Sequence, residues 1–274
     1  MPELPEVETV AAALRSHLPG RRVAGIAVRC EKLRRPMPVK ALQSLVNEAI
    51  CGVRRRAKYL LIDMSDGQTL VIHLGMSGTL RLAANGENAE RHDHLDLQLD
   101  NGKVLRFRDP RKFGLVMVVK PNERGEIKEL GELAPEPLSE DFTTDYFYDL
   151  SRKRTTAVKN FIMDQRRVVG VGNIYASESL FRARIRPTTA VGKLGKERCR
   201  HLVAVTREVL AEAIATGGTT ISDFYGVDGS EGAFARELQV YGRAGKPCIK
   251  CGQPIEKLTL GGRSTFYCPQ CQKK

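Results

Sequence analysis

The sequence predicts an α+β protein, in which an antiparallel β-sandwich or barrel-like domain is followed by a helical domain and a zinc ribbon. Three observations support this prediction. Strand patterns recur up to residue 119, helical spacing dominates residues 151–215, and two Cys-x2-Cys pairs lie in the last 27 residues. The length of 274 residues is sufficient for one large domain or two ordinary ones.

The composition indicates a globular protein with an anionic partner. Hydrophobic residues make up 42% of the chain and charged residues 28%, without an uncharged apolar run that could span a membrane. The first residues are acidic and lack the basic flank and apolar core of a signal peptide, so we expect a cytoplasmic, nucleoid-associated protein without a membrane partner. The net charge of +12 favours a polyanion such as nucleic acid.

The N-terminal stretch predicts a buried helix that begins a few residues after Pro2. Pro5 suits the first helical turn because its missing N–H needs no partner there. Gly20 is a plausible end of this helix. The apolar residues that fall on one face at spacings of three and four are Val7, Val10, Ala11, Leu14 and Leu18.

The rest of this half is predicted to be mostly strands, with a second amphipathic helix over residues 39–46. Asp66-Gly67 and Asn101-Gly102 are typical of hairpin turns and favour antiparallel pairing. The predicted strands are Val23–Arg29, Tyr59–Met64, Thr69–Met76, His94–Asp100, Val104–Arg108 and Leu115–Val119.

Pro2 is a candidate nucleophile. A small residue after Met1 normally allows removal of the initiator methionine, which would leave a free secondary amine on Pro2. Such an amine condenses with an aldehyde-like carbon to a charged iminium, which is an electron sink. Glu3 could transfer protons beside it. The alternative is that Pro2 is an incidental start and Glu3 a solvated charge.

Three further positions in this half are chemically unusual. Lys58 follows a basic run at the start of an apolar strand, where a solvated basic edge is the alternative. Met76 lies in a glycine-flanked turn, and Phe113 lies in a turn beside Arg111 and Lys112. Exposed apolar side chains next to arginines are the type that inserts between DNA bases, whereas the alternative places Met76 and Phe113 in the core.

The C-terminal half is basic and helical. Residues 151–186 hold nine cations and two anions, and residues 121–140, rich in Glu, Gly and Pro, predict a hinge before them. A helix over 156–165 precedes a glycine turn, after which Asn173 is a good N-cap for a helix to Arg182. A capped helix N-terminus can bind a phosphate, although an ordinary helical hairpin would show the same pattern. Lys196–Ala215 predicts a long helix, and Thr219–Ala235 a mobile loop.

The cysteine spacing near the end is the most specific signal. Two Cys-x2-Cys pairs, separated by 16 residues, suit one tetrahedral Zn²⁺ in a β-hairpin ribbon. Four thiolates leave no open coordination position, so the zinc is expected to be structural. Arg263 lies at the hairpin tip, where a basic residue favours nucleic acid. The predicted ligands are Cys248, Cys251, Cys268 and Cys271.

Together, these residues resemble the bacterial formamidopyrimidine-DNA glycosylases, which excise oxidised purines such as 8-oxoguanine. The resemblance extends over essentially the full chain and follows the order of the motifs. The matching motifs are Pro2–Thr9, Arg55–Leu61, His73–Gly78, Asp109–Gly114, Val169–Phe181 and the zinc finger with Arg263.

The resemblance implies a bifunctional DNA glycosylase and AP lyase of base excision repair. By position, Pro2 would attack the sugar carbon and Glu3 would act as proton donor, while Lys58 would assist the first elimination and Arg263 the second. The enzyme would flip the damaged base out of duplex DNA. Met76, Arg111 and Phe113 match residues that fill the gap and probe the opposite cytosine. The other DNA-binding positions implied are His92, Arg154, Lys159 and Asn173.

The resemblance also implies a monomer with a β-sandwich lobe at 1–130, a linker at 131–150, a helix–two-turns–helix region at 151–235 and a zinc finger at 236–274. Residues 219–235 correspond to the loop that closes over the flipped base. One alternative is an endonuclease VIII-like glycosylase for oxidised pyrimidines, against which Leu4 and the Met76, Arg111 and Phe113 set argue. A second alternative is a non-catalytic zinc-finger protein that senses damaged DNA.

Overall fold

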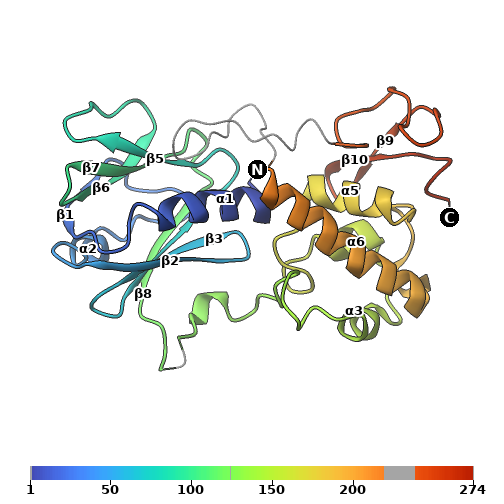
Figure 1. Ribbon diagram of the computed structural model, residues 1–274, viewed down its shortest axis with the longest axis horizontal. Helices are drawn as coiled ribbons and strands as arrows, with labels where there is room; N and C mark the ends of the chain where they lie inside the picture. Colours follow the sequence, from blue (N-terminus) through green and yellow to red (C-terminus); the bar gives the residue numbers. More distant parts are fainter. Residues whose placement is uncertain (1, 124, 219–237, 274) are drawn as a thin grey trace. The chain divides into compact units, whose positions relative to one another are not determined.

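The computed structural model describes residues 2–123, 125–218 and 238–273. These residues divide into two compact units, which are drawn in Figure 1. The first unit comprises residues 2–131 with 217–218, and the second comprises residues 132–216 with 238–273. Within the part of the chain that is described, no helix is both long and apolar enough to cross a membrane.

The first unit contains two four-stranded antiparallel sheets, which agrees with the predicted antiparallel β-sandwich. One sheet has the order β1-β6-β7-β5 and the other the order β2-β3-β4-β8. Apolar residues from both sheets and from two helices share one buried core. The strands are β1 (Val23–Val28), β2 (Ile50–Arg56), β3 (Tyr59–Met64), β4 (Thr69–His73), β5 (Thr79–Ala84), β6 (Asp93–Leu99), β7 (Lys103–Arg108) and β8 (Leu115–Val119).

Helix α1 (Leu4–Arg15) begins where the sequence predicts but ends earlier. Pro5 lies in its first turn, and the predicted apolar face is buried against the sheets. The expectation that Gly20 ends the helix is wrong, since the last helical residue is Arg15. Leu18 is still buried in the apolar core, and its N–H donates to the carbonyl of Leu14. The Gly20 N–H donates to the carbonyl of Ile50.

Two strands were not expected from the sequence, β2 and β5, and β4 ends at His73 instead of Met76. The strand pattern of β2 is hidden in the sequence because its second half is a run of arginines, which pair with carboxylates in the folded protein. Arg54 pairs with Asp63, and Arg55 pairs with Glu8. Helix α2 (Val39–Gln43) is also shorter than the predicted range 39–46.

The second unit is helical around its own core. Its helices are α3 (Thr144–Ser151), α4 (Val158–Ile162), α5 (Asn173–Arg182) and α6 (Lys196–Ala215), and short 3-10 turns lie at Lys128–Leu130 in the first unit and Val191–Lys193 in the second. Helix α6 has its predicted bounds, whereas α4 covers only half of the range 156–165. Residues 131–150, expected as a linker, include α3, whose Phe147 lies in this core.

The C-terminal hairpin consists of β9 (Glu256–Leu260) and β10 (Arg263–Tyr267), which pair antiparallel. Gly261 and Gly262 form its tip with φ of 57° and 71°, a backbone conformation that glycine adopts without strain. A small core that includes Phe181 of α5 and Phe266 of β10 fixes the hairpin to the helices. The loop predicted at 219–235 lies outside the described residues.

Candidate functional site

The N-terminal residues are held firmly at the start of α1. Pro2 is buried, and Glu3 is the N-cap with only 2% of its surface exposed. The Glu3 N–H donates to Glu6 Oε2 at 2.8 Å, while the Glu3 carboxylate accepts from the Glu6 N–H. This reciprocal capping box fixes the backbone on either side of Glu3. The residue that carries the candidate nucleophile is therefore attached to a rigid helix end.

Lys58 lies in the tight turn between β2 and β3. Arg56 pairs with Tyr59, which leaves Ala57 and Lys58 as the two turn residues. Ala57 is buried with φ of 53°, a conformation that costs a non-glycine residue about 1 kcal/mol. The Lys58 side chain is also buried, with 6% exposed. A buried lysine at a strained turn is unlike the solvated basic edge considered above.

His73 is a candidate residue that the sequence reasoning missed. It ends β4 directly opposite Tyr59, and the two rings lie edge to face at 4.9 Å. Burial, together with the charges of Lys58 and Arg34, lowers the pKa of His73 to about 4. The Gly75 N–H donates to Nδ1 at 2.9 Å, so the proton of the neutral ring is on Nε2. The available signal was its place at the end of an apolar strand, directly before the glycine turn.

Met76 and Phe113 are exposed, unlike the core residues on the adjacent strands. Their exposed fractions are 37% and 46%, and they lie on the turn after β4 and on the loop before β8. The guanidinium of Arg111 lies 4.9 Å from the centre of the Phe113 ring. These exposures disagree with the core alternative and fit side chains that contact a partner.

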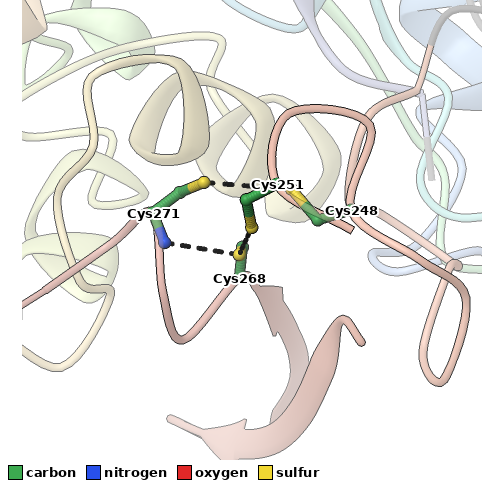
Figure 2. A group of neighbouring side chains, drawn as sticks. All are labelled: Cys248, Cys251, Cys268 and Cys271. Carbon is green, nitrogen blue, oxygen red and sulfur yellow. Dashed lines mark hydrogen bonds between the residues drawn. The ribbon is translucent and has the colours of Figure 1, made fainter. Parts of the chain in front are cut away.

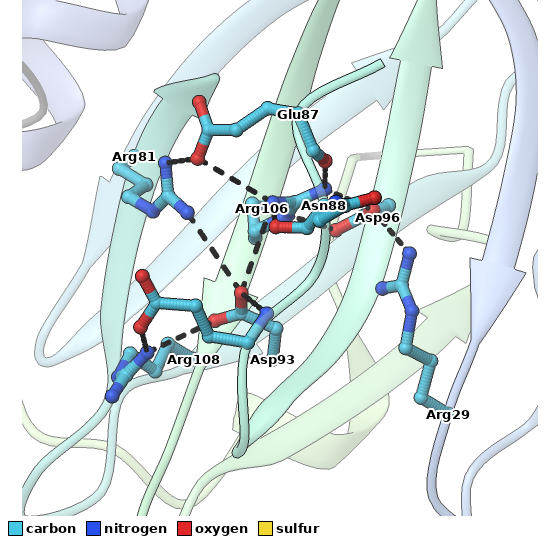
Figure 3. A network of polar contacts seen from close by, with 9 residues as sticks. Arg29, Arg81, Glu87, Asn88, Asp93, Asp96, Arg106 and Arg108 are labelled. Carbon is cyan, nitrogen blue, oxygen red and sulfur yellow. Dashed lines mark hydrogen bonds and ion pairs between the residues drawn. The ribbon is translucent and has the colours of Figure 1, made fainter. Parts of the chain in front are cut away.

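His92 follows a loop that is fixed by a network of ion pairs. The buried Arg106 donates to both carboxylate oxygens of Asp96, at 2.8 and 2.9 Å, and also to the carbonyls of Glu87 and Asn88 (Figure 3). Those two carbonyls belong to the loop that leads to His92. The backbone of His92 has φ of 77°, which lies in the left-handed region. The fixed loop therefore sets the position of the His92 side chain.

In the second unit, Lys159 and Asn173 join the helices to the finger. Lys159 Nζ donates to Asn173 Oδ1 at 2.5 Å and to Thr265 Oγ1 at 2.6 Å, and the lysine is completely buried. Asn173 Nδ2 donates to the carbonyl of Ser264 at 2.9 Å. The prediction that Asn173 is an N-cap is wrong. Gly172 occupies the N-cap position, because the Asn173 side chain is directed to the finger.

Arg154 and Arg263 are exposed on the second unit. Arg154 Nε donates to the carbonyl of Leu150 at 2.9 Å, which places the guanidinium over the end of α3. Arg263 begins β10, paired with Leu260 across the hairpin tip. Both guanidinium groups are accessible to a phosphate or another anion.

The four predicted zinc ligands converge at the base of the finger, as Figure 2 shows. Their sulfur atoms all lie within 4.8 Å of one another, with Cys248 and Cys271 at 3.9 Å and Cys251 and Cys268 at 3.5 Å. Tetrahedral zinc with Zn–S bonds of about 2.3 Å requires sulfur separations of about 3.8 Å. The backbone N–H groups of Lys250 and Cys271 donate to these sulfurs and favour the thiolate form. The site therefore fits one closed, structural zinc ion.

Comparison with family models covers most of the chain. Residues 1–116 match the formamidopyrimidine-DNA glycosylase N-terminal domain, and residues 133–225 match the H2TH domain of the same glycosylases. Residues 245–274 match a zinc finger found in FPG and IleRS.

Full-length relatives agree with these matches. The formamidopyrimidine-DNA glycosylase of Xanthomonas campestris pv. campestris (strain B100) is 50% identical over 273 residues, which is 100% of both chains. A solved structure of a mutant Lactococcus lactis FPG with a Fapy-dG containing DNA has a TM-score of 0.93, at 34% identity over 100% of both chains. Another complex, of wild-type L. lactis FPG with an oxidised pyrimidine containing DNA, has a TM-score of 0.92, also at 34% identity over 100% of both chains.

Proposed function

The chain belongs to the formamidopyrimidine-DNA glycosylase family, and we propose that it excises oxidised purines from duplex DNA through covalent catalysis by the Pro2 amine. It is a DNA glycosylase and AP lyase of base excision repair, with DNA as its partner. The substrates proposed are 8-oxoguanine and formamidopyrimidines. The full-length identity of 50% to a formamidopyrimidine-DNA glycosylase carries this assignment.

The proposed reaction begins when the Pro2 nitrogen forms a bond to the sugar C1′ of the flipped nucleotide. The bond from C1′ to the damaged base breaks, and the base leaves with the electron pair and gains a proton. Glu3 protonates the ring oxygen as the sugar opens, which yields an iminium between Pro2 and C1′. Two eliminations then release the phosphates on either side of the sugar, and water hydrolyses the remaining adduct.

The buried position of Glu3 and Lys58 supports these roles. Glu3 is 2% exposed and Lys58 is 6% exposed, so their side chains exchange few protons with bulk water and can act on a bound substrate. We assign the removal of the first proton after iminium formation to Lys58. We assign phosphate binding during the second elimination to Arg263, because its guanidinium is exposed on the hairpin tip.

We propose that Met76, Arg111 and Phe113 fill the space left by the flipped base, with Arg111 probing the opposite cytosine. His73, His92 and Arg154 are proposed phosphate contacts. We propose that Lys159 and Asn173 belong to the DNA-binding face of the second unit. The proposed divisions are a catalytic lobe at 1–130, a linker at 131–150, a helix–two-turns–helix region at 151–235 and a finger at 236–274, in a protein that acts as a monomer.

Borohydride trapping tests the nucleophile. The enzyme, incubated with an 8-oxoguanine duplex and sodium borohydride, should form a covalent adduct, because the iminium is reduced to a stable amine. Pro2→Gly should weaken or abolish the adduct while it preserves binding to undamaged duplex. Intact-mass spectrometry of the same sample should show that Met1 is removed. A wild-type enzyme without Met1 that never traps would contradict the proposal.

Substrate preference decides between purines and pyrimidines. We expect faster excision of 8-oxoguanine opposite cytosine than of thymine glycol opposite adenine. The alternative is an endonuclease VIII-like enzyme, and the L. lactis relative crystallised with an oxidised pyrimidine containing DNA makes this comparison necessary. A clear preference for thymine glycol would reject the purine assignment but keep the covalent mechanism.

A further inference from the structure

We propose that Asp109 is a positioning residue that holds the three gap-filling side chains in one arrangement and thereby sets the preference for cytosine opposite the lesion. The inference rests on the proposed function of Met76, Arg111 and Phe113. Asp109 itself is completely buried, so it acts through these residues and does not contact DNA.

The Asp109 carboxylate joins the turn that carries Met76 to the loop that carries Arg111. Ser77, the neighbour of Met76, donates its hydroxyl to Asp109 Oδ1 at 2.7 Å. The Arg111 N–H lies 3.3 Å from the same Oδ1 and 3.2 Å from Ser77 Oγ. One carboxylate oxygen therefore fixes the backbone next to two of the gap-filling residues.

The second carboxylate oxygen fixes the far end of the loop. The Gly114 N–H donates to Asp109 Oδ2 at 2.7 Å, and the Lys112 N–H donates to the Asp109 carbonyl at 3.2 Å. Lys112 has φ of 55°, a left-handed backbone conformation that is strained for a non-glycine residue. These hydrogen bonds supply the restraint that such a conformation needs. Phe113 lies between these two bonded residues, and its backbone is therefore fixed on both sides.

The turn that carries Met76 and the loop that carries Arg111 and Phe113 also touch through their backbones. A Cβ atom placed on Gly75 would lie 2.5 Å from the carbonyl carbon of Phe113 and 2.6 Å from the nitrogen of Gly114. One on Gly114 would lie 2.7 Å from the Phe107 ring and 3.0 Å from Asp109 Oδ2. Only glycine permits this approach, which brings the Met76 turn within hydrogen-bond range of Asp109.

The backbone of Asp109 extends the link to a third segment. Its N–H donates to the carbonyl of His92 at 3.0 Å, and its carbonyl is 3.0 Å from Nε2 of the buried His94. His92, a proposed phosphate contact, and the three gap-filling residues are thus all attached to the buried Asp109. The carboxylate of Asp96 on β6 is bonded instead by Arg106 and Arg29 (Figure 3).

The chemistry requires a carboxylate at this position. Both oxygens of Asp109 accept hydrogen bonds, one of them from a hydroxyl and an N–H. An asparagine has a single acceptor oxygen, and its NH₂ group would face an N–H donor. The loop would then lose a hydrogen bond at one end and become less ordered before DNA binds. The ordering cost would have to be met during recognition, which weakens discrimination.

The test compares Asp109→Asn with Asp96→Asn in the full-length enzyme. Asp96 is a matched control because it is a buried, hydrogen-bonded carboxylate that does not bond the Met76 turn or the Arg111 loop. Three duplexes are used: 8-oxoguanine opposite cytosine, 8-oxoguanine opposite adenine, and an abasic site opposite cytosine. Single-turnover rates give the cytosine-to-adenine ratio for excision, and the abasic duplex reports lyase chemistry.

We expect Asp109→Asn to lower the cytosine-to-adenine ratio about tenfold, since small displacements of positioning groups cost one to two orders of magnitude. Abasic cleavage should change much less, because no intact base has to be recognised. Asp96→Asn should leave the ratio unchanged even if it lowers thermal stability. An unchanged ratio in folded Asp109→Asn, or an equal change in Asp96→Asn, would overturn the proposal.

Two further variants complete the test. If Asp109→Asn does not fold, Ser77→Ala removes the hydroxyl that donates to Oδ1 and accepts from the Arg111 N–H, and it should lower the ratio in the same direction. In an Arg111→Ala background the ratio is already reduced, and Asp109→Asn should reduce it no further, because Arg111 is the one of the three side chains that is proposed to probe the cytosine. Additive losses would indicate a merely structural role. A wild-type enzyme that excises no lesion would contradict the proposed function instead.

Discussion

Arg55 and Glu8 form an ion pair in which Arg55 Nε lies 2.6 Å from Glu8 Oε2. The same guanidinium donates through Nη1 to the carbonyl of Ala57 at 3.0 Å. One arginine therefore connects the helix that follows Pro2 to the strained turn that carries Lys58. We expect the positions of Pro2 and Lys58 within the first unit to depend on this connection.

Replacement of Arg55 should impair covalent chemistry more than DNA binding. We expect Arg55→Gln to slow borohydride trapping and to reduce the free energy of unfolding by about 1–3 kcal/mol, because Glu8 loses a partly buried partner. The control is Arg54→Gln, whose ion pair with Asp63 is more exposed, 52% at the arginine against 10% at Arg55. Denaturant unfolding and trapping rates measure both effects. Equal behaviour of the two variants would show that the Arg55 connection is unimportant.

Zinc removal should unfold the finger and abolish DNA binding. The finger has a small core, so the metal supplies much of its folding free energy. We expect chelator-treated protein to lose nicking activity and to regain it when zinc is restored, while the far-UV circular dichroism of the two larger cores persists. Cys268→Ser should have the same effect, whereas Cys51→Ser, at an exposed cysteine outside the cluster, serves as the control. Full nicking after complete chelation would refute the structural role.

The depressed pKa of His73 predicts a pH dependence of stability. The pKa is about 4 in the folded state and about 6.5 in the unfolded state, so between these values only the unfolded chain binds the proton. His73 therefore destabilises the fold progressively as the pH falls from 6.5 to 4, and has no effect above 6.5. His73→Gln should flatten this part of the stability profile. Chemical denaturation at a series of pH values measures it, and parallel profiles would disprove the assignment.

Arg154 and Lys159 should differ in their effect on the salt dependence of DNA binding. Arg154 is exposed, and we expect Arg154→Ala to lower the slope of log K against log salt concentration by about one. Lys159 is buried with its amine bonded to Asn173 and Thr265. Lys159→Met should therefore lower the melting temperature of the finger-bearing unit through lost hydrogen bonds. A larger change of slope for Lys159→Met than for Arg154→Ala would contradict this division.

Much of the fold was predictable because local chemistry specifies it. Pro5 and the apolar face predict the start of α1, and Asp66-Gly67 and Asn101-Gly102 predict turns that connect β3 to β4 and β6 to β7. Helix α6 follows from its periodicity. Strand β2 was not predictable in this way, because its arginines are paired in the folded chain, Arg54 with Asp63 on β3 and Arg55 with the distant Glu8 on α1.

The candidate site shows the same distinction between local and distant information. The sequence by itself determined the zinc ligands, since four cysteines at this spacing have few other uses, and it made Pro2, Lys58, Met76 and Phe113 candidates. The structure decided that Met76 and Phe113 are exposed. Only the tertiary structure decided that His73 is neutral beside Lys58, that Asn173 bonds the finger instead of capping α5, and that Asp109 joins three segments. The physical reason is that burial and hydrogen-bond partners depend on residues brought together from distant parts of the chain.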